Sequence, residues 1–300
     1  MAEVTNHILF AKKIMKKINT SNKNLYLYSV GPDSFYFGKD TYNFAKIMHK
    51  SNSRLFFENY IKYIKDNNLK NNLDVISSLY GFITHYVLDY TIHPYVFYKG
   101  GIFNRNDINT LKYLDGHRSI EMGITSYYYG KNINNFKMYE YMNIKNNNYI
   151  KSTLDYVLKQ TYNIDNGYNK YLKSYNQMRL TYKYFRFDKY GIKKAIYKFT
   201  DLFRKNKSKL SYISFHNINN VDLNINHNKW INPCDKNISY FTSVDDLFNK
   251  SEMETLRLIK ISKDLLFDKI DINEFRNKFP NLSYLSAQEC DSKKYLRYFE

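Results

Sequence analysis

The chain has 300 residues, 43% of them hydrophobic and 25% charged, and its net charge at neutral pH is +18. This composition allows one large domain, or two at most, and excludes a disordered tail. Ten glycines and four prolines are too few for an all-β sandwich, and two cysteines are too few for a disulfide framework or a cysteine-ligated zinc module. Two explanations of the charge stay open: a nucleic-acid or anionic-membrane partner, or an AT-rich genome that enriches Lys, Asn, Tyr, Ile and Phe together.

The first part of the chain has apolar residues at helical spacing. Residues 5–18 predict a first helix, with apolar side chains on one face and lysines opposite. Residues 31–33, Gly-Pro-Asp, predict a loop. Residues 42–66 again have helical periodicity, with an interruption near Ser51.

The most apolar segment, residues 73–93, predicts a central helix. We expect this helix to end before Pro94, because proline disfavours the α conformation of the residue that precedes it. Gly100-Gly101 predicts a loop, and residues 107–128 predict a further helix with Gly116 inside it.

The remaining sequence predicts helices joined by polar connections. Residues 131–220 are rich in Asn, Lys and Tyr, and residues 242–269 form a clear late helix with Thr242 or Ser243 as its cap. The segment after Pro280 gives no prediction.

We therefore expect an all-α fold in one domain. Residues 1–300 would divide into a metal-site core (1–125), a variable helical region (131–220) and a C-terminal helical region (221–300). The N-terminus lacks a secretory signal pattern, and no stretch approaches the ~18 apolar residues of a membrane span. We expect a cytoplasmic protein with no obligate protein partner, and peripheral contact with an anionic membrane stays open.

Three polar residues form a stripe along the central helix. His85, Asp89 and His93 are four residues apart in an otherwise apolar segment, and at about 100° per residue they fall on one face. Burying such groups without partners costs about 1–3 kcal/mol each. The stripe is either a hydrogen-bonded core network or a metal site, because imidazole and carboxylate groups at this spacing can share a zinc ion. Since eight residues rise about 12 Å, two ions suit the stripe better than one.

A second pair, His117 and Glu121, repeats this spacing on the next predicted helix. If the two helices pack side by side, with Gly116 allowing close approach, His93 joins the pair in a three-ligand site with an open position. That composition is typical of catalytic zinc. Three earlier residues are unremarkable singly but would add ligands to a cluster: His7, Asp33 and His49.

Together these residues resemble the zinc-dependent phospholipase C family, bacterial enzymes that include the catalytic domain of clostridial alpha-toxin. More distantly they resemble the single-strand nucleases of the S1/P1 type. The resemblance covers residues 1–125 and rests on an ordered set: His7, Gly31-Pro32-Asp33, Met48-His49, Gly81 to Asp89, His93-Pro94-Tyr95, and His117 with Glu121. A later segment, His227 to Pro233, resembles the C-terminal part of shorter members.

The resemblance implies an all-α fold around two to three zinc ions. It places one ion between Asp33, His49, His85 and Asp89, a second between His93, His117 and Glu121, and a third between His7 and Asp89. In the family, an N-terminal tryptophan completes the third site. The only tryptophan here is Trp230, so the filling of that site stays open.

The implied activity is metal-assisted hydrolysis of a phosphodiester, in which activated water cleaves the head group from a phospholipid and Asp33 is the base. Neighbouring aromatic residues either line a pocket for a choline-like group or belong to the core, which we favour; they are Phe35, Tyr36, Tyr86 and Tyr95. Two alternatives stay open: a nuclease acting on single strands, and a zinc-binding family member with little catalysis. We expect His216, which lies outside the pattern, to bind no zinc.

Overall fold

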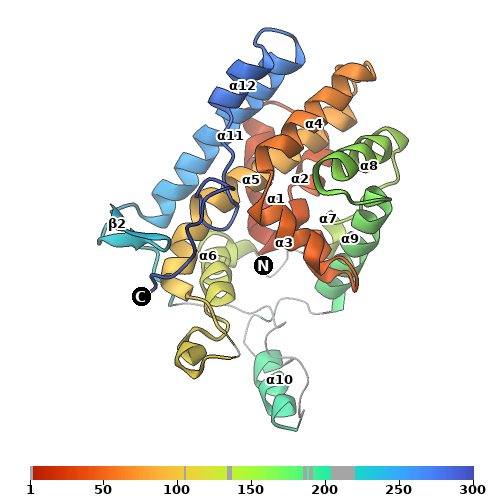
Figure 1. The fold of residues 1–300 in the computed structure, drawn as a ribbon. Coiled ribbons are helices and arrows are strands. Elements are labelled where there is room, and N and C mark those ends of the chain that lie inside the picture. Colours follow the sequence, from red (N-terminus) through yellow and green to blue (C-terminus); the bar gives the residue numbers. More distant parts are fainter. Residues whose placement is uncertain (1–2, 105, 134–136, 185–187, 189–191, 204–219) are drawn as a thin grey trace.

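The computed structural model describes residues 3–104, 106–133, 137–184, 188, 192–203 and 220–300, and it confirms the all-α fold class (Figure 1). In chain order the elements are α1 (Val4–Lys17), α2 (Asn24–Tyr28), η1 (Gly31–Phe37), α3 (Tyr42–Lys50), α4 (Ser53–Asp66), α5 (Leu73–Gly100), η2 (Ile108–Tyr113), α6 (Gly116–Ile133), α7 (Met138–Tyr141), α8 (Asn148–Tyr162), α9 (Gly167–Tyr184), α10 (Ile192–Leu202), β1 (Trp230–Asn232), β2 (Asp235–Tyr240), α11 (Val244–Leu266) and α12 (Ile272–Lys278). The two strands pair antiparallel in a small sheet that the sequence did not predict.

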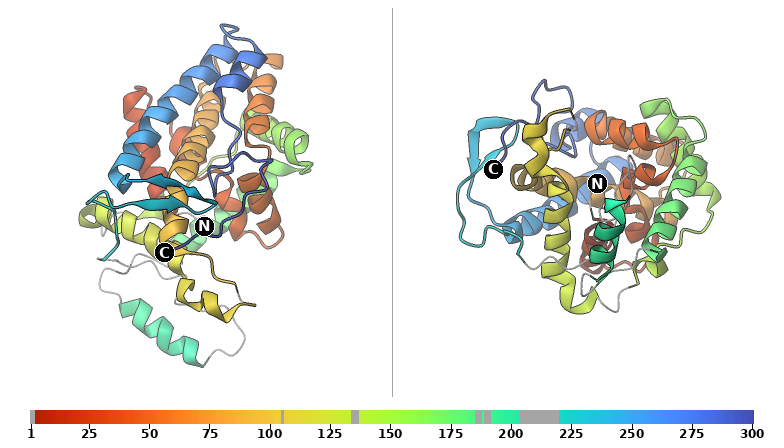
Figure 2. Two further views of the ribbon diagram at one scale, coloured as in Figure 1. Left: turned by 60° about the vertical axis from the view of Figure 1, so that its left-hand side comes forward. Right: turned by 90° about the horizontal axis from the view of Figure 1, so that it is seen from below.

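Helix α5 passes through the middle of the molecule, and α2, α6 and α11 pack against it (Figures 1 and 2). The expected end before Pro94 is wrong, because the helix continues through Pro94 to Gly100. Proline removes one N–H donor from the helix, and burial of the preceding turn and of Tyr95 and Val96 outweighs that loss. The helix ends where Gly101, at a φ of +60°, donates its N–H to the Phe97 carbonyl.

Helices α5 and α6 meet at two glycines. The expectation of a continuous helix over 107–128 is wrong, because Asp115 has a φ of +64° and separates η2 from α6. Gly116 therefore begins α6 instead of lying inside a helix. A Cβ atom on Gly116 would lie 2.0 Å from the Gly100 carbonyl oxygen, so the close approach requires glycine. This contact places His117 beside the end of α5.

The segment expected to be a loop, Gly31 to Asp33, is instead the start of the short 3-10 helix η1. Gly31 has a φ of +54°, and a Cβ atom there would lie 2.4 Å from Cγ of His85. The chain therefore passes directly over the imidazole ring and places Asp33 beside it.

The later helices agree with the sequence where the structure describes them. Helices α7 to α10 lie in the region expected to be helical, and α11 is capped by Ser243, which forms a capping box with Asp246. The segment after Pro280 is also ordered. The Tyr86 hydroxyl donates to the Pro280 carbonyl and accepts from the Leu282 amide, which fixes the segment against α5.

The aromatic residues near the histidine stripe are mostly core. Phe35, Tyr86 and Tyr95 are fully buried, whereas Tyr36 is only partly buried. Trp230 is buried in β1, and its ring packs against Tyr95. The expected core role is therefore confirmed for the three buried side chains. None of the helices in the described ranges has the length and apolar composition that a membrane crossing needs.

Candidate metal centre

Eight ligand-type side chains from five elements converge beside α5. They are His7 on α1, Asp33 on η1, His49 on α3, His85, Asp89 and His93 on α5, and His117 and Glu121 on α6. All are nearly inaccessible to solvent except His117, whose side chain is 16% exposed. The i, i+4 spacing aligns the three α5 residues, and the contact between Gly100 and Gly116 brings the α6 pair to them.

Asp33, His49 and His85 form the first group. Their candidate ligand atoms all lie within 4.8 Å of one another. Nε2 of His49 lies 3.1 Å from Oδ1 of Asp33, and Nε2 of His85 lies 3.1 Å from Oδ2 of Asp89. Asp89 therefore adjoins this group, as the four-residue set inferred from the resemblance requires.

His7, His85 and Asp89 form the second group, again within 4.8 Å of one another. Nε2 of His7 lies 3.2 Å from Oδ1 of Asp89, while the other carboxylate oxygen faces His85. The rings of His7 and His85 stack with their centroids 4.1 Å apart. One carboxylate thus lies between two imidazoles.

His93, His117 and Glu121 form the third group. Nε2 of His93 and Nε2 of His117 each lie 3.2 Å from Oε1 of Glu121. His93 also adjoins Asp89, whose Oδ1 is 3.6 Å from its Nε2. The three groups are therefore contiguous.

Backbone carbonyls orient three of the imidazoles. Nδ1 of His49 donates to Ala45 O at 2.7 Å, and Nδ1 of His85 donates to Ser29 O at 3.0 Å. Nδ1 of His93 donates to Tyr284 O at 2.8 Å. Because a carbonyl only accepts, each Nδ1 carries the proton in the neutral ring and leaves the Nε2 lone pair directed into the cluster. This arrangement is typical of histidines that ligate metals.

Many polar atoms in the cluster lack a well-directed hydrogen bond among the described residues, although some of them lie 3.1–3.2 Å from an ion-pair partner. They are Nδ1 of His7, both carboxylate oxygens of Asp33, Nε2 of His85, Oδ2 of Asp89, both ring nitrogens of His117, and Oε2 of Glu121. Leaving buried polar atoms unsatisfied is costly, and native proteins retain few of them. Imidazole nitrogens and carboxylate oxygens are the donors that zinc prefers, so these residues fit zinc ions.

The electrostatics of the cluster also favour cations. Burial alone would raise the pKa of each carboxyl group, but the surrounding histidines outweigh it and hold the pKa of Asp33, Asp89 and Glu121 below its usual range. Burial opposes a charge on His93, yet Asp89 and Glu121 raise its pKa to about 9. Burial lowers the pKa of His117. The three carboxylates are therefore ionised at neutral pH and available to cations.

A small cavity of about 20 Å³ opens between the second and third groups, with room for about one water molecule or ion. Glu3 and Asn6 line it beside the candidate ligands, and the sequence did not indicate either residue. Oε1 of Glu3 accepts hydrogen bonds from Thr5 and from the Tyr182 hydroxyl. The spacing of four residues between Glu3 and His7 was the only available signal.

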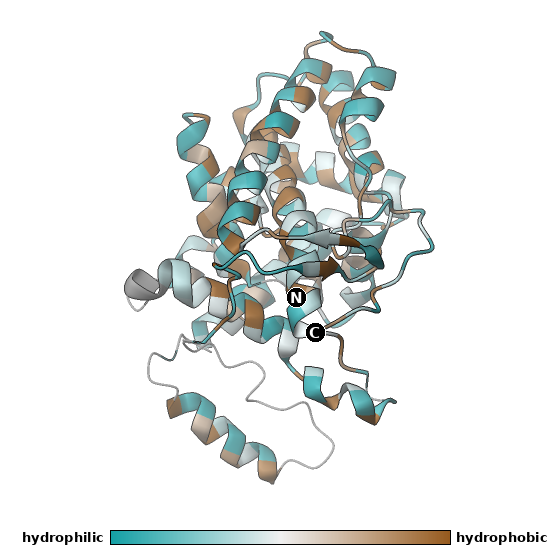
Figure 3. Cartoon of the chain, turned by 90° about the vertical axis from the view of Figure 1, so that its left-hand side faces the viewer, coloured by the Kyte–Doolittle hydropathy of each residue, from teal (hydrophilic) through white to brown (hydrophobic). Residues whose placement is uncertain are grey.

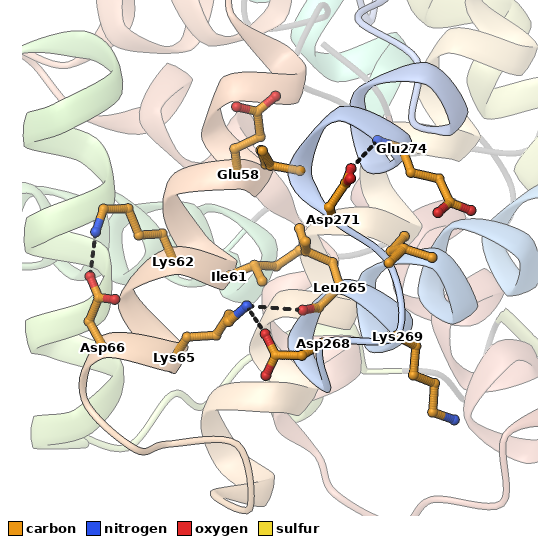
Figure 4. A pocket seen from close by; sticks show the side chains of 12 residues that line it. Glu58, Ile61, Lys62, Lys65, Asp66, Leu265, Asp268, Lys269, Asp271 and Glu274 are labelled. Carbon is orange, nitrogen blue, oxygen red and sulfur yellow. Dashed lines mark hydrogen bonds and ion pairs between the residues drawn. The ribbon is translucent and has the colours of Figure 1, made fainter.

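A larger cavity of about 650 Å³ lies between α4 and the turn that joins α11 to α12 (Figure 4). Four of its charged side chains pair with one another, Lys62 with Asp66 and Lys65 with Asp268. No histidine is among the described residues that line it. It shares no residue with the three ligand groups and does not compete with them as the functional site.

The profile of one protein family, described as zinc dependent phospholipase C, matches residues 3–217. The chain therefore belongs to the zinc-dependent phospholipase C family, as the resemblance indicated. No curated protein and no solved structure matched the chain. The matched range contains all eight candidate ligands and ends before Tyr284, which orients His93. His216 lies outside the described residues, and His227 is an exposed residue beside Asp246.

Proposed function

We propose that the protein is a zinc-dependent, phospholipase C-like hydrolase that cleaves the phosphorylated head group from a phospholipid. Family membership supports the reaction class, and the convergence of eight ligand-type side chains, seven of them buried, carries the proposal. Several nitrogen and oxygen atoms of the cluster lack a well-directed hydrogen bond. A hydrogen-bonded core network would satisfy such atoms, so their presence favours a metal site over that alternative.

The proposed ligand sets follow the three groups. Asp33, His49, His85 and Asp89 would hold one ion, His93, His117 and Glu121 a second, and His7 with Asp89 a third. The third set has the fewest protein donors, so we propose two to three ions in total. Glu3 lines the cavity next to this set.

Zinc would supply Lewis-acid charge at the phosphoryl group and make water more acidic. Among the chain's own groups, Asp33 is the proposed base. His49 and His85 hold its pKa low against burial, so it is ionised and can accept a proton. Its Oδ2, the oxygen 3.9 Å from Nε2 of His7, accepts no hydrogen bond from the described residues. Asp89 would orient two imidazole rings, that of His7 through its Oδ1 and that of His85 through its Oδ2.

The test is a parallel assay of zinc-loaded protein on phosphatidylcholine vesicles, a soluble phosphodiester and single-stranded DNA. We expect release of phosphocholine from the vesicles. Asp89→Asn should lower this rate at least about 100-fold, because it weakens a carboxylate shared by two ligand sets. Asp40→Asn, at an exposed position, is the matched control. Cleavage of DNA alone would instead identify a nuclease, and bound zinc without turnover on any substrate would identify a zinc-binding protein with little catalysis.

A further inference from the structure

Helix α10 has an apolar face that is turned toward solvent. Ile192, Ile196 and Phe199 recur at helical spacing, and with Ala195 and Leu202 they fall within an arc of about 120°. Its isoleucine, phenylalanine and leucine side chains are each more than half exposed. The lysines of the helix, at 193, 194 and 198, lie on the remaining surface. A helix that packs on a protein core has the opposite arrangement, with its apolar face buried.

Helix α10 stands apart from the helical body, and its apolar and polar residues alternate along the ribbon (Figures 1 and 3). The amide of Lys194 donates to Asp188 at 3.2 Å, which anchors the start of the helix. Burial lowers the pKa of Lys194, and Asp115 and Arg118 are close enough to act on it electrostatically. The polar side of α10 thus lies near the start of α6, which contains His117.

His117 is the most solvent-accessible of the eight candidate ligands. The metal centre is therefore most accessible at the first turn of α6, and Lys194 of α10 lies close enough to this turn to act on Arg118 electrostatically. The short helix η2 projects from the same end of the molecule (Figures 1 and 2). Its Ile108 and Leu111 are also more than half exposed. Two elements at this end of the molecule, α10 and η2, thus present exposed apolar side chains.

In the sequence, positive charge is concentrated in and next to the segment that forms this helix. Residues 183–209 contain ten lysines and arginines against two aspartates, a surplus of eight out of the chain's +18. Lysines beside an exposed stripe of isoleucine, phenylalanine and leucine are typical of helices that lie in the interface of an anionic bilayer. Single-stranded nucleic acid would use the charge but would leave the aliphatic side chains in water.

We propose that α10 and η2 form a membrane-docking surface that holds the metal centre against a phospholipid bilayer containing anionic lipid. The inference rests on the proposed phospholipase activity. It explains how the enzyme would reach phospholipids that are packed in a bilayer. The apolar stripe of α10 would enter the boundary between head groups and acyl chains, and Lys193 and Lys198, at the edges of the stripe, would lie among the lipid phosphates. Docking in this way would place His117 next to the head-group layer.

The test is binding of the zinc-loaded full chain to vesicles, measured by flotation, which does not require turnover. We expect stronger binding to mixed phosphatidylcholine and phosphatidylserine vesicles than to phosphatidylcholine alone, and weaker binding as salt increases. The double variant Ile196→Asp with Phe199→Asp should bind the mixed vesicles at least about tenfold more weakly. Met253→Asp, at an equally exposed apolar position on α11, should bind like the wild type.

Unchanged vesicle binding by the α10 double variant would overturn the inference, as would binding of single-stranded DNA without binding of vesicles. Thermal unfolding of the double variant serves as the folding control, and no loss is expected because both side chains are exposed. Vesicle binding that depends on α10 but occurs without phospholipid hydrolysis would contradict the proposed activity and leave the docking surface standing.

Discussion

Asp89 is the residue that joins the three candidate ligand groups. Its Oδ1 lies 3.2 Å from Nε2 of His7 and 3.6 Å from Nε2 of His93, and its Oδ2 lies 3.1 Å from Nε2 of His85. The sequence predicted this central position because α-helical geometry is regular, so a four-residue spacing translates into a known distance and direction. Its proposed role as a ligand shared between ions requires bound zinc, and direct metal analysis measures the zinc content.

Replacing His93 should remove one ion. His93→Ala deletes a ring that faces both Asp89 and Glu121, so zinc content should fall by about one ion relative to the wild type. The measurement is elemental analysis of protein purified without added chelator, with circular dichroism as a folding control. His216→Ala and His227→Ala, both outside the candidate set, should retain the wild-type content. An unchanged zinc content in His93→Ala would contradict the proposed second site.

Other residues at the site were beyond the reach of sequence patterns. The groups that orient His85 and His93 are the main-chain carbonyls of Ser29 and Tyr284. Every residue has a carbonyl, so no side-chain pattern marks the ones that are used. Glu3 lines the cavity from the position that caps α1, where acidic residues are common for local reasons.

At the scale of elements, α5 and the segment after Pro280 depart most from expectation. Local propensity predicted a helix end at Pro94, and tertiary packing of a buried helix prevailed. The C-terminal segment has no periodic pattern, yet its Tyr284 is buried and contacts three candidate ligands, His49, His85 and His93. The Tyr284 amide donates to His49 O at 2.9 Å, and its carbonyl accepts from His93. These hydrogen bonds join residues that are far apart in the sequence. They depend on the assembled fold, so no local sequence pattern predicts them.

Tyr284→Ala should therefore weaken both stability and metal binding. The change removes a fully buried aromatic ring, which costs about 3 kcal/mol or more of unfolding free energy, and it loosens the backbone that orients His93. Zinc affinity should fall about 10- to 100-fold, as is usual when the support of a ligand is lost. Chemical denaturation and a competition titration with a zinc chelator measure the two effects.

Tyr295→Ala is the matched control for this prediction, because Tyr295 belongs to the same segment and is mostly exposed. It should change stability by no more than about 0.5 kcal/mol. Wild-type zinc affinity in a folded Tyr284→Ala protein would show that the C-terminal segment does not support the metal centre.

At the scale of the whole molecule, the net charge has become more informative than the sequence alone suggested. Genome composition remains an adequate reason for lysines elsewhere, but the surplus over residues 183–209 accompanies an exposed apolar helix.

We also propose that residues 1–300 form one domain. In support, a cluster of buried apolar residues includes Ile8, Tyr171 and Leu258, one from each region distinguished in the sequence.

The metal-free protein should lose stability in alkaline solution. The pKa of His93 rises from 6.5 to about 9 on folding, so its stabilising contribution is fully present below about pH 6.5 and disappears as the pH rises through about 9. The depressed carboxyl pKa values act oppositely, and their contribution is lost as the pH falls below about 4. Zinc must displace the His93 proton, so the stability gained from zinc should increase across the alkaline window.

Thermal unfolding of chelated and zinc-loaded protein between about pH 6 and about pH 9 measures this divergence. His93→Gln is the control, because it removes the titrating group and should flatten the alkaline loss in the metal-free protein. If the melting temperatures of the chelated and zinc-loaded wild type change in parallel with pH, zinc does not displace the proton of His93.

The position of Tyr284 between His49 and His93 has a consequence for how the centre fills. The two imidazoles belong to different proposed ions, yet one residue donates to the backbone of the first and accepts from the ring of the second. An ion that immobilises either histidine would also immobilise Tyr284, so the next ion would meet a ligand already held in place. Occupancy of the two sites would then be positively cooperative, with fewer half-filled molecules than two independent sites of the same mean affinity would give.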